Sequence, residues 1–175
     1  MLSKLQIMDI KAAETEAGQT FAELIETVGY LEDNELNKVP FEGSWTAGQV
    51  VQHVILSAGG FVHLLNGPTI DSQRDPEASI PMIKGIFLNF STKMKSPDSI
   101  DPKEKNYSKM DLINTLNTIK LELSKSISTL DISKICMLYE IPTMGHISRA
   151  EAIIFVTVHT QRHIHQLKNI LKQLA

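Results

Sequence analysis

This chain contains little cysteine and carries only a small net charge. One cysteine, Cys136, occurs in 175 residues, which excludes an intramolecular disulfide framework and a metal site built from cysteines alone. The 17 basic and 20 acidic side chains leave a net charge of -3, and this balance does not supply the concentrated positive field that phosphate binding needs. We therefore expect no nucleic-acid partner, and any metal must be held by nitrogen or oxygen.

Long hydrophobic runs are also absent. The longest candidate, Ala150 to Val158, is about half the roughly 18 apolar residues of a membrane-spanning helix, and the N-terminal residues lack the apolar stretch of a secretory signal. We expect a cytoplasmic protein with no membrane partner. The length and the 42% hydrophobic content fit a single domain over residues 1–175.

Four long stretches repeat apolar residues every three or four positions, and none shows the sustained two-residue alternation of a strand. Two of these stretches begin with a capping box, Thr46 with Gln49 and Ser148 with Glu151. The sequence predicts an all-α fold, a four-helix bundle with negligible strand content. The expected long helices run from Ile10 to Leu31, from Thr46 to Asn66, from Ser108 to about Ile127, and from Ser148 to about Lys172.

The second helix should end at Asn66-Gly67-Pro68, where glycine can adopt the left-handed conformation and proline cannot continue the helix. From about Gly67 to Tyr107 the chain holds five prolines, so this connection cannot be one regular element. We expect a short extra helix within it, over Ser79 to Met94. Long connections in compact domains tend to be functional, and this one is a candidate for shaping a pocket or a subunit contact.

Six histidines are the part of the composition that can supply nitrogen ligands. His159 and His163 lie four residues apart in the last predicted helix, so their rings can point at a single ion. Both fall within its apolar stripe, whereas His165 falls on the opposite side. Buried imidazoles need partners, and a metal provides them. Two alternatives remain. The pair can hydrogen-bond to other polar groups of the core, or the apolar face of the helix is rotated from the one assigned here and the pair lies in a groove.

A third ligand is available in His53, midway along the second helix, because a facing helix can deliver it to the same ion. His63 falls on the polar side of that helix, and His146 is most simply a loop residue. Between the paired histidines stands Thr160, where the HExxH motif of zinc proteases has its glutamate. A protease of that kind is therefore disfavoured.

Two segments carry a family resemblance. The first is Gly43 to Val54, in which Trp45 and Thr46 open a helix and a histidine follows about two turns later. The second is Gly145 to Gln166, which contains the HxxxH pair. Together they resemble the DinB-like (DinB/YfiT) superfamily over nearly the whole chain. The resemblance implies a four-helix bundle whose three histidines, His53, His159 and His163, hold a divalent metal ion.

Members of this superfamily resemble one another in metal site more than in reaction. Some are thiol S-transferases that use bacillithiol or glutathione, some are mycothiol-dependent isomerases or transferases, and many are described as metal-dependent hydrolases. The resemblance implies a metal-dependent enzyme of hydrolase or thiol S-transferase type, with a small-molecule substrate that includes a low-molecular-weight thiol in the second case. The alternative is a non-catalytic metal-binding or interaction bundle. No motif selects among these activities.

Three imidazoles leave at least one coordination position open, as in catalytic zinc sites, and water or a thiolate can fill it. We expect zinc or nickel first, with iron, cobalt and copper also compatible with this ligand set. An open position would favour an enzyme, and a fourth protein ligand would favour a structural site.

Three further side chains are candidates for supporting the site. Arg162 and Gln166 flank the pair and can orient a carboxylate or support a ligand, although Arg162 equally fits a solvated residue whose stem packs on the bundle. Trp45 either lines the pocket mouth or packs onto the core as a staple. Cys136 has apolar neighbours and is expected to be buried and unreactive. A homodimer is also compatible, because small bundles commonly bury an apolar face against a second copy.

Overall fold

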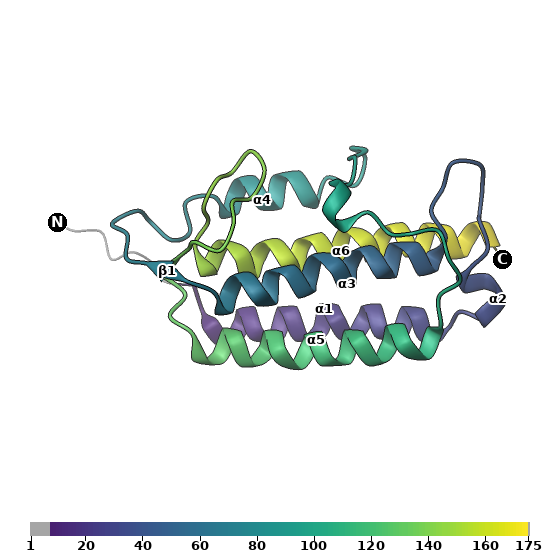
Figure 1. Ribbon diagram of the computed structural model, residues 1–175, viewed down its shortest axis with the longest axis horizontal. Coiled ribbons are helices and arrows are strands. Elements are labelled where there is room, and N and C mark those ends of the chain that lie inside the picture. The colour runs from purple at the N-terminus through teal and green to yellow at the C-terminus, as the bar shows by residue number, and fades with distance from the viewer. Residues whose placement is uncertain (1–7, 175) are drawn as a thin grey trace.

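The computed structural model describes residues 8–174, and its framework is four long helices (Figure 1). They are α1 (Ile10–Gly29), α3 (Ala47–Asn66), α5 (Lys109–Thr129) and α6 (Arg149–Leu174). Both α1 and α3 pack against α5 and α6, so the four helices surround one shared core. The predicted all-α four-helix bundle is confirmed.

The connection between α3 and α5 sets the helix directions. Helices α1 and α6 run one way along the bundle, and α3 and α5 run the other way (Figure 1). Two consecutive long helices can be parallel because residues 67–108 return along the bundle before α5 begins. This connection contains β1 (Thr69–Ile70), α4 (Ile80–Phe87) and a single 3-10 turn, η1 (Asp98–Ile100). We call residues 88–102 the crossover.

Both predicted capping boxes are confirmed. The Thr46 hydroxyl accepts from the Gln49 amide at 3.1 Å, and the Gln49 side chain accepts from the Thr46 amide at 2.9 Å. Ser148 and Glu151 make the same reciprocal pair, at 3.0 and 2.9 Å. These contacts satisfy amides that have no partner within the helix, which is why α3 and α6 begin where the sequence predicted.

Four short elements of the described chain were not predicted: α2 (Asp33–Leu36), the strands β1 and β2 (Ile135–Cys136), and the turn η1. Helix α2 forms where the sequence indicated only the end of the first helix, because Glu32 and Glu35 make a capping box of their own. The two-residue strands β1 and β2 pair antiparallel, with Thr69 opposite Cys136. Strands of two residues are too short to give a periodic sequence signal.

The extra helix is shorter than predicted, because α4 ends at Phe87 and does not reach Met94. Beyond it the Asn89 side chain accepts from the amide of Ser91 at 3.3 Å and from its hydroxyl at 2.6 Å. Such local bonds offer the backbone an alternative to the helix, so the chain turns away and continues as the crossover.

Gly67 ends α3 in an extended conformation, with φ -79° and ψ -174°, and the prediction of a left-handed glycine was wrong. A Cβ at this position would lie 3.1 Å from the Cβ of Leu138 and 3.3 Å from the His63 carbonyl oxygen. Glycine therefore allows the end of α3 to approach the segment after β2 closely, and its dihedral freedom is not used.

The core of the bundle is formed by apolar side chains from all four long helices. A smaller cluster joins α4 to α6 through Ile83, Phe87, Ile154 and Val158, which fixes the start of the crossover beside the middle of α6. Of the described helices, α3 is long and apolar enough to cross a membrane by length and composition, and 61% of that stretch is buried in the bundle. Burial of this extent is typical of a core helix.

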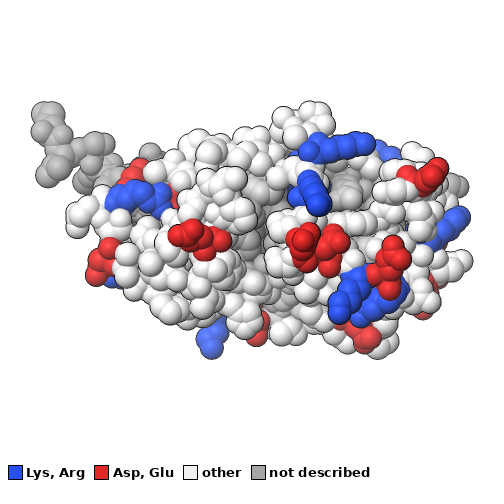
Figure 2. Space-filling model, turned by 45° about the horizontal axis from the view of Figure 1, so that its top comes forward, with Lys and Arg blue, Asp and Glu red and all other residues white. Residues whose placement is uncertain are grey.

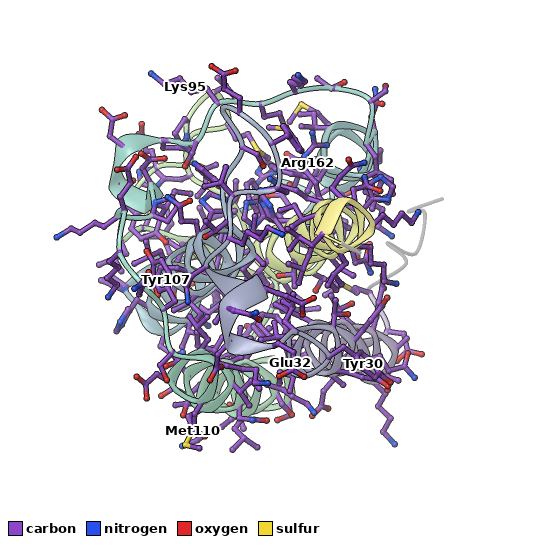
Figure 3. All side chains as sticks on the ribbon, turned by 90° about the vertical axis from the view of Figure 1, so that its right-hand side faces the viewer. Tyr30, Glu32, Lys95, Tyr107, Met110 and Arg162 are labelled. Carbon is purple, nitrogen blue, oxygen red and sulfur yellow. The ribbon has the colours of Figure 1, made fainter. Side chains whose placement is uncertain are left out.

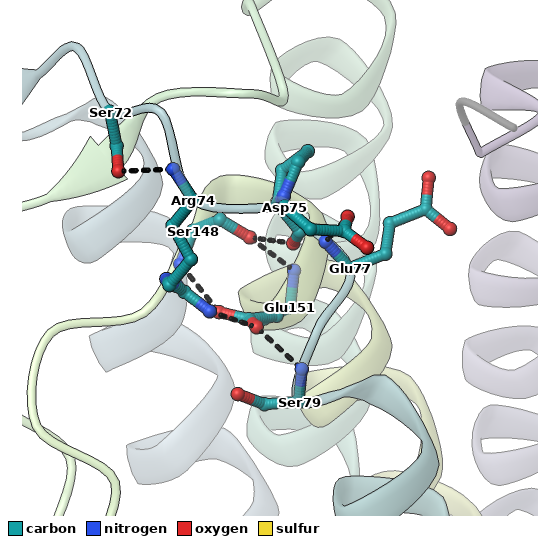
Figure 4. A network of polar contacts seen from close by, with 8 residues as sticks. Ser72, Arg74, Asp75, Glu77, Ser79, Ser148 and Glu151 are labelled. Carbon is teal, nitrogen blue, oxygen red and sulfur yellow. Dashed lines mark hydrogen bonds and ion pairs between the residues drawn. The ribbon is translucent and has the colours of Figure 1, made fainter. Parts of the chain in front are cut away.

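A buried carboxylate ties the start of the connection to α6 (Figure 4). The Glu151 side chain is fully buried and accepts two hydrogen bonds of 2.7 Å from the Arg74 guanidinium. It also accepts from the amides of Ser79 at 2.8 Å and Ser148 at 2.9 Å. Burial raises the pKa of Glu151, but these donors outweigh it and hold the pKa below 4.5. The capping residue of α6 thus also anchors the chain before α4.

Glu151→Gln should destabilise the fold by about 2 kcal/mol at pH 7, because a neutral amide places an N–H against donors that need an acceptor. The difference from wild type should shrink as the pH falls below the ordinary value of 4.5 toward the lowered pKa of the folded carboxyl, because the unfolded wild-type chain takes up a proton there before the folded carboxylate does. Urea unfolding at pH 7 and pH 3.5 measures both effects. The exposed Glu42→Gln is the matched control, and an equal loss in both variants would contradict the assignment.

Candidate metal centre

His53 lies on α3 with its side chain directed into the bundle and only 3% exposed. Its Nδ1 lies 2.9 Å from the carbonyl oxygen of Ile100 in η1. A carbonyl oxygen can only accept, so Nδ1 carries the hydrogen and Nε2 presents its lone pair. The crossover thereby fixes both the orientation and the tautomer of the ring.

His159 and His163 follow one another on the inner face of α6 and are 6% and 8% exposed. The Nε2 atom of His159 lies 3.2 Å from the Nε2 of His163 and 3.2 Å from the Nε2 of His53. His163 Nδ1 lies 2.8 Å from the Gln166 side-chain oxygen, which fixes its hydrogen on Nδ1 as well. The predicted inward placement of the pair is confirmed.

The three rings therefore converge through nitrogens that need a positive partner. With hydrogens on Nδ1 of His53 and His163, both Nε2 atoms aim lone pairs at the Nε2 of His159. A hydrogen on His159 Nε2 can serve only one of them at a time, whereas a metal ion accepts all three. Nitrogens held at about 2.0–2.1 Å around a tetrahedral ion lie roughly 3.3 Å apart, close to the 3.2 Å spacings of these pairs.

Burial keeps these ligands in the neutral form that binds metals. It lowers the pKa of His53, against the opposing effects of the Ile100 carbonyl and the charge of Asp101. It lowers the pKa of His163 to about 3. The pKa of His159 lies well below 6.5, because of burial first and then the neighbouring histidines. Protonation therefore does not compete with a metal at neutral pH.

One polar atom of the site has no hydrogen-bond partner in the described part of the chain. It is Nδ1 of His159, which is buried. The ring packs against Phe87 and Phe155, with ring centroids 5.6 and 6.1 Å away. A buried group without a partner costs about 1–3 kcal/mol, and metal binding at Nε2 offsets such a cost. The three-histidine set therefore fits a divalent ion, with two of the three ligands oriented by hydrogen bonds.

No further His, Cys, Asp or Glu among residues 8–174 joins this group. Three nitrogen donors alone leave room for an exogenous ligand, which is the arrangement of catalytic zinc sites. By this criterion the described residues favour the open coordination that the sequence predicted.

The three candidate supporting residues differ in what they contact. Gln166 contacts a predicted ligand directly, as described above. Trp45 packs against the core, as the staple interpretation predicted, and also lies beside His53, with ring centroids 5.2 Å apart. Within the described part of the chain, Arg162 pairs with no carboxylate and makes no hydrogen bond to a predicted ligand. It donates to the backbone carbonyls of Phe87, Asn89 and Thr92, a role that the sequence did not predict.

The remaining histidines lie outside the cluster. His63 and His165 are exposed, as expected, although His165 also stacks on Phe90 with centroids 4.3 Å apart. His146 is half-buried in the loop before α6 and bonds the Cys136 carbonyl at 3.0 Å. Cys136 is buried, as predicted, and burial raises the pKa of its thiol to about 11, which disfavours the reactive thiolate at neutral pH.

The contacts of Ile100 and Phe87 with the site were missed by sequence reasoning. Ile100 contributes a backbone carbonyl, which every residue carries, and Phe87 contributes a ring that reads as ordinary core. Neither leaves a chemical signature in the sequence. Only the path of the whole connection between α3 and α5 reveals them.

A family model described as the DinB superfamily matches residues 16–167 of this chain, a range that includes all three converging histidines. Among solved structures, YfiT from Bacillus subtilis is similar, with a TM-score of 0.61 and 18% identity over 99% of this chain and 90% of that chain. YfiT is described as a probable metal-dependent hydrolase with an unusual four-helix bundle topology. At this identity the likeness establishes the fold. No curated protein matches the chain.

The metal-free protein should lose stability as the pH falls from 6.5 to 5. Folded His159 and His163 stay neutral there because burial holds their pKa values well below the ordinary value, while the unfolded chain takes up protons at its ordinary pKa. His163 alone, with a pKa of about 3 in the fold, accounts for about 2 kcal/mol over this interval. His163→Gln should reduce the loss by that amount in urea unfolding at pH 7 and pH 5. An unchanged pH dependence would contradict a buried neutral His163.

Proposed function

The chain belongs to the DinB superfamily, and from this premise we propose that it is a metal-dependent enzyme whose divalent ion is held by His53, His159 and His163. The observation that carries the proposal is the convergence of three Nε2 atoms, two of them on rings whose Nδ1 atoms already face acceptors. We expect zinc or nickel, since both accept imidazole ligands.

When bound, such an ion lowers the pKa of a water or thiol that joins it and so supplies a nucleophile. The residues of the chain provide the surroundings. The Ile100 carbonyl and Gln166 hold two rings in the ligating tautomer. Trp45 and Phe87 pack against His53 and His159 and exclude water from those sides, which strengthens electrostatic interactions within the site.

Two reaction types follow from this arrangement. A hydrolase is supported by the description of YfiT as a probable metal-dependent hydrolase. A thiol S-transferase would need its thiol from a cosubstrate, because Cys136 is buried and its pKa is raised to about 11. The substrate is in either case a small molecule that reaches the open position of the ion.

A second candidate, a non-catalytic metal-binding bundle, is favoured by one observation. The three histidines are 3%, 6% and 8% exposed, and hollows beside Phe90 and Tyr107 are not lined by them. A metal at a closed site would stabilise the bundle without turning over a substrate.

Replacing any one ligand should remove the metal. His53→Ala, His159→Ala and His163→Ala should each lose most of the bound divalent ion, because two imidazoles hold it far more weakly than three. Inductively coupled plasma mass spectrometry of untagged protein, after loading with zinc or nickel and gel filtration, measures the content. His63→Ala changes an exposed histidine of α3 and should retain it. Unchanged metal content in all three ligand variants would overturn the proposal.

Cobalt-loaded protein separates the candidates. If the enzyme is an S-transferase, a low-molecular-weight thiol should join the open position and produce a sulfur-to-cobalt charge-transfer band. For a hydrolase we expect no such band but turnover of activated esters or amides, lost in His159→Ala. The absence of both would favour the non-catalytic bundle.

A further inference from the structure

The proposed ligands are buried, yet a substrate must reach them. The α3 and α6 sides of the site are long helices packed in the bundle core. The crossover lies over the remaining side, where Ile100 contacts His53 at 2.9 Å and the Ser96 hydroxyl lies 3.4 Å from the same nitrogen. Access to the metal centre therefore depends on how firmly the crossover is held.

The crossover has little core of its own. Of residues 88–102 only Pro102 is buried, and only Ser96 and Ile100 are half-buried. The face of the molecule that it helps to form mixes basic and acidic side chains without a continuous field of either sign (Figure 2). Segments with few buried apolar contacts open at lower free-energy cost than the helices they cover.

Arg162 supplies the main attachment at the start of the crossover. Its Nη1 donates to the carbonyls of Asn89 at 2.8 Å and Phe87 at 3.4 Å, and its Nη2 donates to the carbonyl of Thr92. Figure 3 shows Arg162 on the side of the bundle where Lys95 marks the outer edge. Burial lowers the pKa of Arg162, and none of the described acidic groups forms an ion pair with it. A guanidinium is suited to hold several acceptors at once.

A weaker contact lies next to this one. Phe90 of the crossover stacks on His165, with an interplanar angle of 9°. Arg162 and His165 flank the ligand His163 in the sequence, and Ile100 contacts the ligand His53. The crossover is thus attached to α3 and α6, the two helices that carry the proposed ligands. Each attachment lies within one helical turn of a proposed ligand.

We propose that the crossover is the gate of the metal centre and that Arg162 is the positioning residue that holds it closed. Substrate reaches the ion when residues 88–101 swing away from α6, with the chain turning near Leu88 and Pro102. That this gate controls access to a metal rests on the proposed function. The contacts by which Arg162 holds the crossover, which we call the clamp, are a property of the metal-free chain.

Metal binding and gate closure are coupled. A metal on Nε2 of His53 makes its Nδ1–H a stronger donor to Ile100, so the loaded protein holds the crossover more tightly. By linkage, closure of the crossover strengthens metal binding by the same factor as metal binding strengthens closure. The device opens for exchange of substrate and closes around the loaded site.

Limited trypsin digestion of the metal-free protein tests the clamp. Lys93 and Lys95 lie in the crossover, and Lys103 and Lys105 lie just beyond it and serve as an internal reference. Arg162→Gln should raise cleavage after the first two by about tenfold or more, because charge-assisted hydrogen bonds are lost. Arg162→Lys should restore part of the protection, since an ammonium reaches fewer carbonyls.

Lys168→Gln is the matched control, because Lys168 is also on α6 but pairs with Glu23 at 2.6 Å. It should digest like wild type. If Arg162→Gln does not fold by circular dichroism, Phe90→Ala at the exposed stack should still raise the cleavage by about threefold. Equal cleavage in folded wild type and folded variant, for either substitution, would overturn the clamp.

The second part of the experiment tests the coupling to metal and uses zinc as the only probe. Zinc should protect Lys93 and Lys95 in wild type. A chelator in excess should remove zinc from Arg162→Gln faster by about the same tenfold factor, because release through the open crossover is proportional to the fraction of molecules in which it is open. Trp45, the single tryptophan, lies beside His53 and reports the release by fluorescence. Unchanged release with increased cleavage would overturn the gate. Failure of every protein to load zinc here, and zinc or nickel in the loading experiment on the ligand variants, would instead overturn the proposed function, and the metal-free digestion would still decide the clamp.

Discussion

The structure depends on one electrostatic requirement, the pairing of three buried imidazole nitrogens that face one another. Two rings are held in the tautomer that exposes Nε2, and within residues 8–174 the Nδ1 of the third, His159, has no hydrogen-bond partner. Nε2 lone pairs turned toward one another are unfavourable in an apolar core unless a cation lies between them. The long helices supply positions rigid enough to keep these nitrogens together, since α3 and α6 pack against each other along the bundle.

Much of the fold was predictable because its determinants are local. Capping boxes at Thr46 and Ser148 mark helix starts through contacts three residues apart, and apolar spacing indicates the inward faces. The end of α3 was assigned correctly for a wrong reason. Gly67 is required by its distance to Leu138, a contact between segments that local sequence does not report. The same limit applies to Glu151, whose partner Arg74 lies 77 residues away.

The site was predictable to the extent that side-chain identity carries chemistry. His159 and His163 follow from helical spacing, and His53 from its helix and the family resemblance. What orients and covers them was not predictable, because Ile100 acts through a backbone carbonyl and Arg162 binds backbone carbonyls. The positive charge of Arg162 suggested that it orients a carboxylate, but in the folded chain its guanidinium donates to backbone carbonyls. Sequence patterns identify ligands better than they identify the main-chain atoms that hold them.

The attachment of the crossover through main-chain carbonyls has an evolutionary consequence. Any residue supplies a carbonyl, so the outward side chains of residues 88–101 can change without loss of the contacts to Arg162 and His53. The three histidines proposed as metal ligands, by contrast, lie on helices whose packing constrains each replacement. Substitutions in this one exposed segment can therefore change which molecules reach the proposed site, while the three histidines beneath it stay the same.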